Sequence, residues 1–126
     1  LPEVSLGVIP GYGGTQRLAN LIGKGKALEL ISTAEMLSAQ ESLKWGLVNN
    51  ICEQSELMSI CEKIASKICR NSPKAISSAI KSVNAGFTDG VDGYEVEKKE
   101  FGKCFGTDEF IEGTTAFLEK RKANFN

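Results

Sequence analysis

The chain has 126 residues, of which 41% are hydrophobic, so it is long enough for one domain with a buried core. Fifteen Lys and Arg residues against sixteen Asp and Glu residues give a net charge of −1, and both signs are interleaved in each half. This excludes the basic surface that binds nucleic acid. No apolar run approaches the ~18–20 residues of a membrane-spanning helix, so we expect no membrane partner.

The cysteines point away from a metal centre. They lack the CxxC spacing of zinc ligands, and the chain contains no histidine. The four are Cys52, Cys61, Cys69 and Cys104. Two disulfides are arithmetically possible, but buried thiols in a reducing compartment agree better with this composition. We expect no metal, and a location in the cytoplasm, or in the mitochondrial matrix if the source is eukaryotic.

The first eighteen residues join a strand-like run to a glycine-rich turn. Glu3 heads the run, and the alternating apolar residues of 4–8 predict a short β-strand. Gly11, Gly13 and Gly14 follow, where the missing Cβ atoms allow a close approach to the backbone. A carboxylate beside exposed N–H groups suits a proton transfer next to a developing oxyanion. The alternative is a structural turn beside a solvent-exposed glutamate.

The rest of the pattern predicts mostly helices. A helix capped by Ser38, with Glu41 completing a capping box, and another begun by Ser72 and Pro73 are the clearest. The expected elements are helices over 15–22 (N-cap Thr15), 26–32 and 38–45, a strand over 47–52, and helices over 57–68, 72–83, 91–104 and 108–122. Short strands followed by a helical majority predict an α/β fold.

Four segments resemble the crotonase superfamily of enoyl-CoA hydratases and isomerases. They are PEVSLGVIPGYGGTQRL at 2–18, SAQ and GLV within 38–48, NSPKA at 71–75, and the stretch 105–125. The resemblance implies the C-terminal part of a crotonase-like (ClpP/crotonase) fold. It implies that residues 1–52 end the crotonase core with its catalytic loop, and that residues 53–126 form a helical region for oligomerisation and for covering CoA.

The resemblance covers only the C-terminal half of the family's subunit, and the sequence begins at Leu1 rather than at a methionine. We therefore expect a portion excised from a longer protein. In the family, the other half holds the second catalytic glutamate and two backbone amides of the oxyanion hole. The chain would then carry half an active site and be inactive alone.

The resemblance implies an enoyl-CoA hydratase, which adds water syn to a trans-2-enoyl-CoA in fatty-acid or short-chain acyl-CoA metabolism. Glu3 matches the family's glutamate that donates a proton to the α-carbon. Gly11 matches the position whose backbone N–H contacts the catalytic water. Tyr12 stands where many hydratases carry a small residue, so its ring could narrow the acyl pocket.

Phe101 and Lys120 match the family positions that contact the adenine and phosphates of CoA from a neighbouring subunit. Stacking on a base and a cation near phosphates are the physical reasons. Two other interpretations stay open: Phe101 packs in a core, and the cations of 120–122 lie in the last turn of a helix, where they favour the macrodipole. CoA enters as part of the substrate, so no cofactor is expected.

The implied partners are an acyl-CoA thioester and further copies of the chain, in a trimer or a dimer of trimers. One alternative is a Δ3,Δ2-enoyl-CoA isomerase or another crotonase-family acyl-CoA enzyme, because Glu3 alone could shuttle the isomerase's proton. Another is a non-catalytic association module. A second glutamate upstream of Leu1 would favour hydration.

Overall fold

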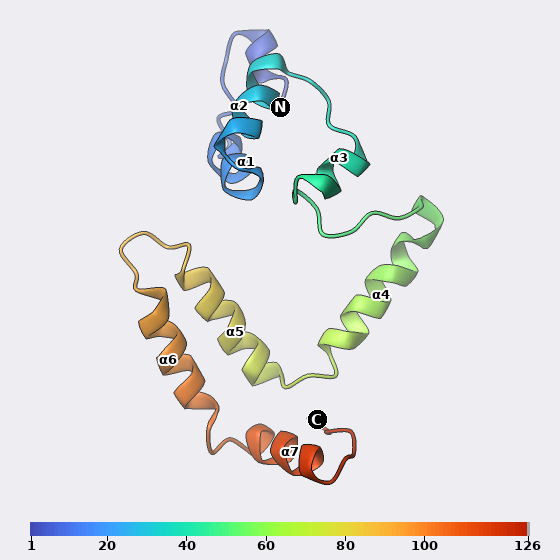
Figure 1. The fold of residues 1–126 in the computed structure, drawn as a ribbon, viewed down its shortest axis with the longest axis vertical. Coiled ribbons are helices and arrows are strands. Elements are labelled where there is room, and N and C mark those ends of the chain that lie inside the picture. The colour runs from blue at the N-terminus through green and yellow to red at the C-terminus, as the bar shows by residue number, and fades with distance from the viewer. Residues whose placement is uncertain (126) are drawn as a thin grey trace. The chain divides into compact units, whose positions relative to one another are not determined.

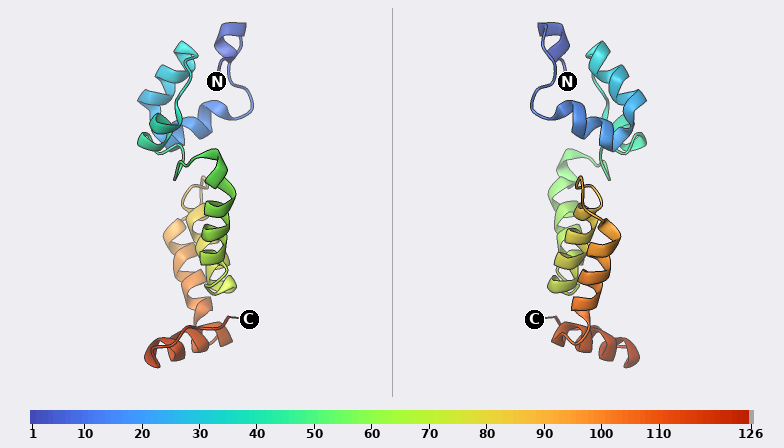
Figure 2. Two further views of the ribbon diagram at one scale, coloured as in Figure 1. Left: turned by 90° about the vertical axis from the view of Figure 1, so that its right-hand side faces the viewer. Right: turned by 90° about the vertical axis from the view of Figure 1, so that its left-hand side faces the viewer.

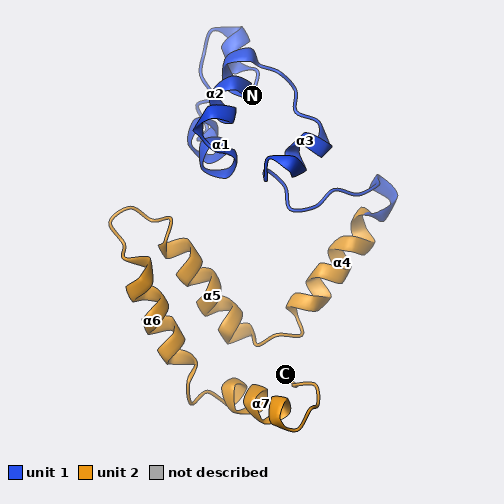
Figure 3. Ribbon diagram, in the orientation of Figure 1, with its two compact units in different colours: residues 1–56 blue, residues 57–126 orange. Residues whose placement is uncertain are grey.

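The computed structural model describes residues 1–125, and every regular element within them is a helix (Figure 1). The elements are η1 (Glu3–Leu6), α1 (Gly14–Ile22), α2 (Lys24–Thr33), α3 (Ala39–Lys44), η2 (Gln54–Glu56), α4 (Leu57–Ile68), α5 (Pro73–Ala85), α6 (Gly93–Cys104) and α7 (Asp108–Leu118). The chain divides into two compact units, Leu1–Glu56 and Leu57–Asn126, called below the N-terminal and C-terminal units (Figure 3).

The expected short strands are not present among the described residues, so the prediction of an α/β fold with short strands before the helices is wrong. The segment headed by Glu3 is a 3₁₀ turn, ended by Gly7 at a left-handed φ of 78°. Residues 47–52 are bends and irregular backbone, and the N–H of Leu47 donates to the carbonyl of Ser42 at 2.8 Å. A strand needs a neighbouring strand to pair its backbone, and neither segment has one within residues 1–125.

The N-terminal unit buries a small apolar core where α1 meets α2. Ile22, Ala27 and Leu30 are buried there. Gly23 ends α1 and begins α2 without a loop, at a φ of 82° that favours glycine. Partly buried side chains surround this core: Leu18, Ala19, Leu37 and Leu47. The core therefore fixes the helix whose first turn follows the glycine-rich loop.

In the C-terminal unit, α5 and α6 lie side by side (Figure 2). The chain segments come close together at Gly93, where a Cβ would stand 2.9 Å from the Cα of Gly86. The helix pair also buries Glu100 of α6. Its carboxylate accepts hydrogen bonds from Lys81 at 2.6 Å, Lys103 at 2.7 Å and Ser78 at 3.1 Å. The pair is thus joined by a polar contact as well as by close backbone packing.

Two predicted helix starts are confirmed. Ser38 and Glu41 form the capping box in full, and Ser72 caps α5 with Pro73 in its first turn. Thr15 is not a cap, because α1 already begins at Gly14. The helix expected over 91–104 starts two residues later, and the helix expected to reach 122 ends at Leu118.

The prediction of buried cysteines is wrong. Three of the four thiols are exposed, the fourth is half-buried, and all four are free: Cys52, Cys61, Cys69 and Cys104. No group of three His, Cys, Asp or Glu residues among residues 1–125 could hold a metal ion. No helix in the described part of the chain is long and apolar enough to cross a membrane.

Candidate active site

Glu3 opens η1, and its side chain holds a buried oxygen without a hydrogen bond. The residue as a whole is half-buried, but the Oε2 atom is buried and receives no hydrogen bond from any described residue. A buried carboxylate oxygen in this state costs free energy, since it loses water without gaining a donor. Such an arrangement is rare in folded proteins and makes Glu3 a candidate for a functional role.

The glycine-rich loop of residues 10–14 lies against the segment that carries Glu3. Pro10 is buried, and a Cβ on Gly14 would stand 3.0 Å from Pro10 and 3.3 Å from the side chain of Leu1. Leu1, which precedes Glu3, and Pro10 of the loop therefore both lie next to Gly14, the first residue of α1. Gly11 is exposed, and its N–H donates no hydrogen bond within the described chain. That amide is available to a ligand.

Arg17, which the sequence analysis did not single out, lies across this loop. Its guanidinium donates to the carbonyl oxygen of Tyr12 and stands 6.0 Å from the centre of the Tyr12 ring. A Cβ on Gly13, whose φ is 78°, would come within 2.7 Å of Nη1 of Arg17. Gly13 thus leaves room for the arginine, and the arginine holds a loop whose tyrosine is 94% exposed. Arg17 follows Gly13 by one helical turn, which is the signal that could have identified it.

Phe101 lies on α6 and is 65% exposed, so packing in a core of this chain does not account for it. Its ring meets Phe105 edge-on, with 4.9 Å between ring centres. At this exposure the Phe101 ring keeps surface that is available for stacking.

Lys120 lies after α7 rather than in its last turn, so that part of the macrodipole interpretation is wrong. The helix ends at Leu118, Glu119 is its C-cap, and Lys120 follows with a φ of 55°. Its side chain is exposed and forms no ion pair within residues 1–125. Glu3 and Gly11 therefore lie in the N-terminal unit, and Phe101 and Lys120 in the C-terminal unit. Their catalytic and binding roles stay predictions.

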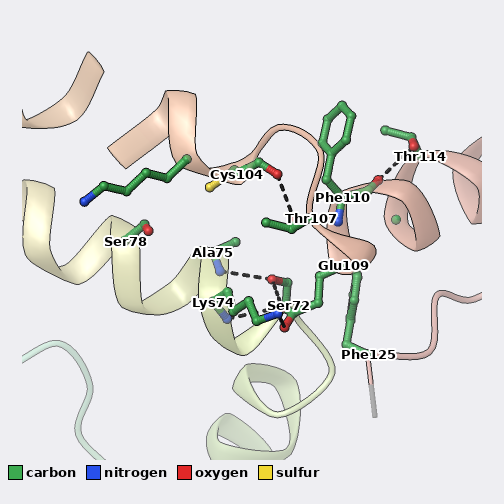
Figure 4. A pocket seen from close by; sticks show the side chains of 12 residues that line it. Ser72, Lys74, Ala75, Ser78, Cys104, Thr107, Glu109, Phe110, Thr114 and Phe125 are labelled. Carbon is green, nitrogen blue, oxygen red and sulfur yellow. Dashed lines mark hydrogen bonds and ion pairs between the residues drawn. The ribbon is translucent and has the colours of Figure 1, made fainter. Parts of the chain in front are cut away.

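A cleft of about 350 Å³ opens between α5, α6 and α7, and it contains none of the four predicted residues (Figure 4). Beside it, Ser72 donates to the carboxylate of Glu109, and the backbone N–H of Lys74 donates to the same carboxylate at 3.2 Å. These bonds, with that of Ser72 first, hold the pKa of Glu109 below its usual range. The chain's own carboxylate therefore occupies the helix N-terminus that an anion would otherwise attract.

Comparison with known proteins matches the chain to one protein family. The family model described as Enoyl-CoA hydratase/isomerase matches residues 1–126. The short-chain-enoyl-CoA hydratase of Clostridium acetobutylicum is 46% identical over 122 residues, which cover 96% of this chain and 47% of that protein. The mitochondrial enoyl-CoA hydratase of Pongo abelii is 45% identical over 125 residues, covering 98% and 43%.

A solved structure agrees with these sequences. The crystal structure of enoyl-CoA hydratase from Bacillus anthracis matches with a TM-score of 0.92 at 40% identity, covering 99% of this chain and 49% of that one. The chain spans about half the length of the relatives it matches. With a family match over its whole length, the chain belongs to the enoyl-CoA hydratase/isomerase family.

Proposed function

We propose that this chain contributes the proton-donating part of the active site of an enoyl-CoA hydratase, a hydro-lyase. The observation that carries the proposal is the buried Oε2 atom of Glu3, which has no hydrogen-bond donor among the described residues, together with the exposed Gly11 amide of the loop that follows. The relatives reported above are named as enoyl-CoA hydratases, which supports this reaction within the family.

In the proposed reaction, water adds across the double bond of a trans-2-enoyl-CoA. The water oxygen bonds to the β-carbon while the carboxylic acid of Glu3 gives its proton to the α-carbon. The N–H of Gly11 orients the water, and backbone N–H groups stabilise the enolate oxygen of the thioester. A second carboxylate from outside this chain accepts one proton from the water, whose other hydrogen stays in the product hydroxyl, and Glu3 is left ionised. Hydration involves no net oxidation or reduction, so the proposed reaction needs no redox cofactor, and with two carboxylates to move the protons we also propose no metal.

We propose that CoA is bound as part of the substrate by residues of the C-terminal unit. The exposed ring of Phe101 offers a face for adenine, and the unpaired ammonium of Lys120 offers a charge for phosphate. The free thiols agree with a reducing compartment, either the cytoplasm or the mitochondrial matrix.

The test is turnover of the full-length enzyme on two substrates. Hydration of crotonyl-CoA, followed by loss of the conjugated thioester's absorbance, is the expected activity. The 126-residue chain alone, at micromolar concentration, should give no turnover above background, because groups that act as a unit are lost together. Conversion of a 3-enoyl-CoA without hydration of crotonyl-CoA would replace the proposal with an isomerase. Clear turnover by the isolated chain that Glu3→Gln abolishes would show that the half-site interpretation is wrong.

We also propose that the C-terminal unit assembles with further copies into a trimer or a dimer of trimers. Large apolar side chains at the end of α7 lie open, with Phe117 82% and Leu118 79% exposed. Exposed apolar groups of this size are typical of interfaces. Deleting residues 108–126 from the full-length protein should reduce its sedimentation coefficient to that of a smaller assembly, and an unchanged coefficient would contradict the proposal.

A further inference from the structure

The turn that ends α7 places a lysine where backbone geometry favours glycine. The N–H of Arg121 donates to the carbonyl of Ala116 at 3.0 Å, and the N–H of Lys120 donates to the carbonyl of Phe117 at 3.2 Å. These two bonds define a helix ending whose left-handed residue is usually glycine. That residue is Lys120, with a φ of 55°. A residue held in a sparsely populated conformation suggests a role for its side chain.

Elsewhere in the described chain, a positive φ occurs at residues without a functional side chain. Its other left-handed positions are six glycines and Ala34, which carries no functional group. Lys120 is therefore the charged exception within residues 1–125. A glycine there would remove the strain, so the ammonium group is the feature that distinguishes the lysine from the less strained choice.

A bidentate ion pair between Arg121 and Glu112 stabilises the turn. Nη1 of Arg121 lies 2.6 Å from Oε1 of Glu112, and Nη2 lies 2.8 Å from Oε2. The backbone N–H of Asn124 donates to Oε1 of the same carboxylate at 2.7 Å. With Arg121 as the main cause, these bonds lower the pKa of Glu112 to about 2. The Glu112 carboxylate is thus ionised at neutral pH, and both of its oxygens accept hydrogen bonds from residues that follow Lys120 in the chain.

The chain after α7 consequently folds back beside the helix (Figure 1). Phe125 completes the return, since its ring lies 3.5 Å from the position a Cβ would take on Gly113. Arg121 also binds Glu119 through Nε at 2.7 Å. The neighbours of Lys120 are therefore held by contacts, while the Lys120 ammonium itself is left unpaired within the described chain.

We propose that Glu112 and Arg121 are positioning residues, whose ion pair holds the α7 turn left-handed and so presents the Lys120 ammonium to the phosphates of CoA. This rests on the proposed function. Neither residue touches the reacting atoms, so the pair acts on the binding of the phosphate-bearing part of the substrate. Without the pair, Lys120 relaxes to a less strained backbone and loses its pre-organised position.

The test compares two substrates in the full-length enzyme. Glu112→Gln keeps the side chain's size but loses its charge. It should raise KM for crotonyl-CoA on the order of tenfold with kcat unchanged. KM for crotonyl-pantetheine, which lacks the adenosine and its phosphates, should not change. Glu119→Gln is the matched control, since that exposed glutamate binds Arg121 without joining Asn124, and its effect should stay below about twofold.

Combining variants separates the pair from the lysine. Lys120→Gln should raise KM for crotonyl-CoA as Glu112→Gln does, and the double variant should be no worse than Lys120→Gln alone, because both changes remove one effect. Arg121→Lys, which keeps the charge but loses the fork, should give an intermediate KM and serves if Glu112→Gln folds poorly.

The outcomes distinguish the two proposals. If Lys120→Gln leaves KM for crotonyl-CoA unchanged, the CoA role of Lys120 fails, and the positioning proposal fails with it. If Lys120→Gln raises KM while Glu112→Gln and Arg121→Lys do not, or if the effects multiply in the double variant, only the positioning proposal is overturned. An equal rise for both substrates would assign the pair a merely structural role.

Discussion

Glu3 of the N-terminal unit and the hydrogen-bonded carboxylates of the C-terminal unit differ in how their oxygens are satisfied. In the C-terminal unit, Glu100, Glu109 and Glu112 each accept several hydrogen bonds, and the pKa of each is lowered. In the N-terminal unit, Glu3 has a buried oxygen with no donor within the described chain. A carboxylate with satisfied oxygens stays ionised and holds helices together. The proton transfer proposed for Glu3 would use the oxygen that no described group binds.

The two units also differ in the residues that they bury. The N-terminal core consists of three buried apolar side chains, Ile22, Ala27 and Leu30. Among residues 57–125, the buried apolar residues are two alanines, Ala85 and Ala116, and the charged Glu100 is buried with them. A buried apolar cluster therefore supports the N-terminal unit, whereas α5 and α6 of the other unit are joined around a buried carboxylate and by close backbone packing. Each contrast can be tested by changing one side chain.

The largest expected effect is on Glu3. Glu3→Gln in the full-length enzyme is nearly isosteric but cannot transfer the proton, so turnover of crotonyl-CoA should fall on the order of 10²–10⁴-fold. The melting temperature should not decrease, because no hydrogen bond to Oε2 is lost. Glu35→Gln, at an exposed position in the same unit, is the control and should leave turnover unchanged. Hydratase activity of Glu3→Gln within a few-fold of wild type would remove Glu3 from the mechanism.

The second effect is on the apolar core. Leu30 is 7% exposed, and Leu30→Ala should lower the free energy of unfolding of the full-length protein by ~2–5 kcal/mol, measured by denaturant titration. Leu30→Met conserves volume and should lower it by less than ~1.5 kcal/mol. Equal losses from the two variants would mean that side-chain volume at this position does not support the unit.

The third effect is on the loop held by Arg17. Gly13 and Gly7 share a φ of 78°, so replacing either by alanine adds ~1–2 kcal/mol of backbone strain. Only at Gly13 would the new Cβ meet Arg17, at 2.7 Å, whereas nothing lies within 4 Å at Gly7. Gly13→Ala should therefore also lower kcat/KM, on the order of tenfold, by displacing the loop. Equal kcat/KM values for the two variants would show that Arg17 does not position the loop.

The elements that sequence reasoning identified are those whose causes are local. The Ser38–Glu41 capping box and the Ser72 cap involve side chains within three residues of the backbone they bind, so pattern sufficed. The prediction of a strand over 47–52 was wrong because a strand depends on a partner strand, which lies far along the chain or outside it. The prediction that the cysteines are buried was wrong for a similar reason, since composition does not say which other residues cover a side chain.

The residues proposed for the site show the same difference between local and long-range causes. Glu3 and Gly11 could be proposed from a contiguous motif, whereas the Glu112–Arg121 pair could not. The periodicity placed both in one helix over 108–122, where nine residues correspond to about 13.5 Å along the axis, too far for an ion pair. Ending α7 at Leu118 reverses the chain and brings the two side chains to 2.6 Å. That reversal follows from the turn around Lys120, which helical periodicity does not encode.

The smallest expected effect is an acid sensitivity of α5 and α6 that the core between α1 and α2 does not share. In the folded state the pKa of Glu100 is lowered to about 2, chiefly by Lys103 and then Lys81, from a usual value of 4.5. A lowered pKa contributes stability above the unfolded value, and that contribution is lost as the pH falls from about 4.5 towards 2. Both lysines are mostly exposed, so water screens the pairs, and protection of α5 and α6 amides from hydrogen exchange should fall by no more than about tenfold.

The comparison within one protein is the decisive measurement. Amides of α1 and α2, around a core without titratable groups, should keep their protection in this pH range after correction for intrinsic exchange. Glu41, whose pKa is lowered by Ser38, lies in α3, so fraying of that short helix would leave the core intact. Glu100→Gln should weaken α5 and α6 at neutral pH and flatten their acid response, because the titrating group is gone. Loss of protection in α1 and α2 over the same pH range would show that both units depend on ionised carboxylates, and the contrast between them would not hold.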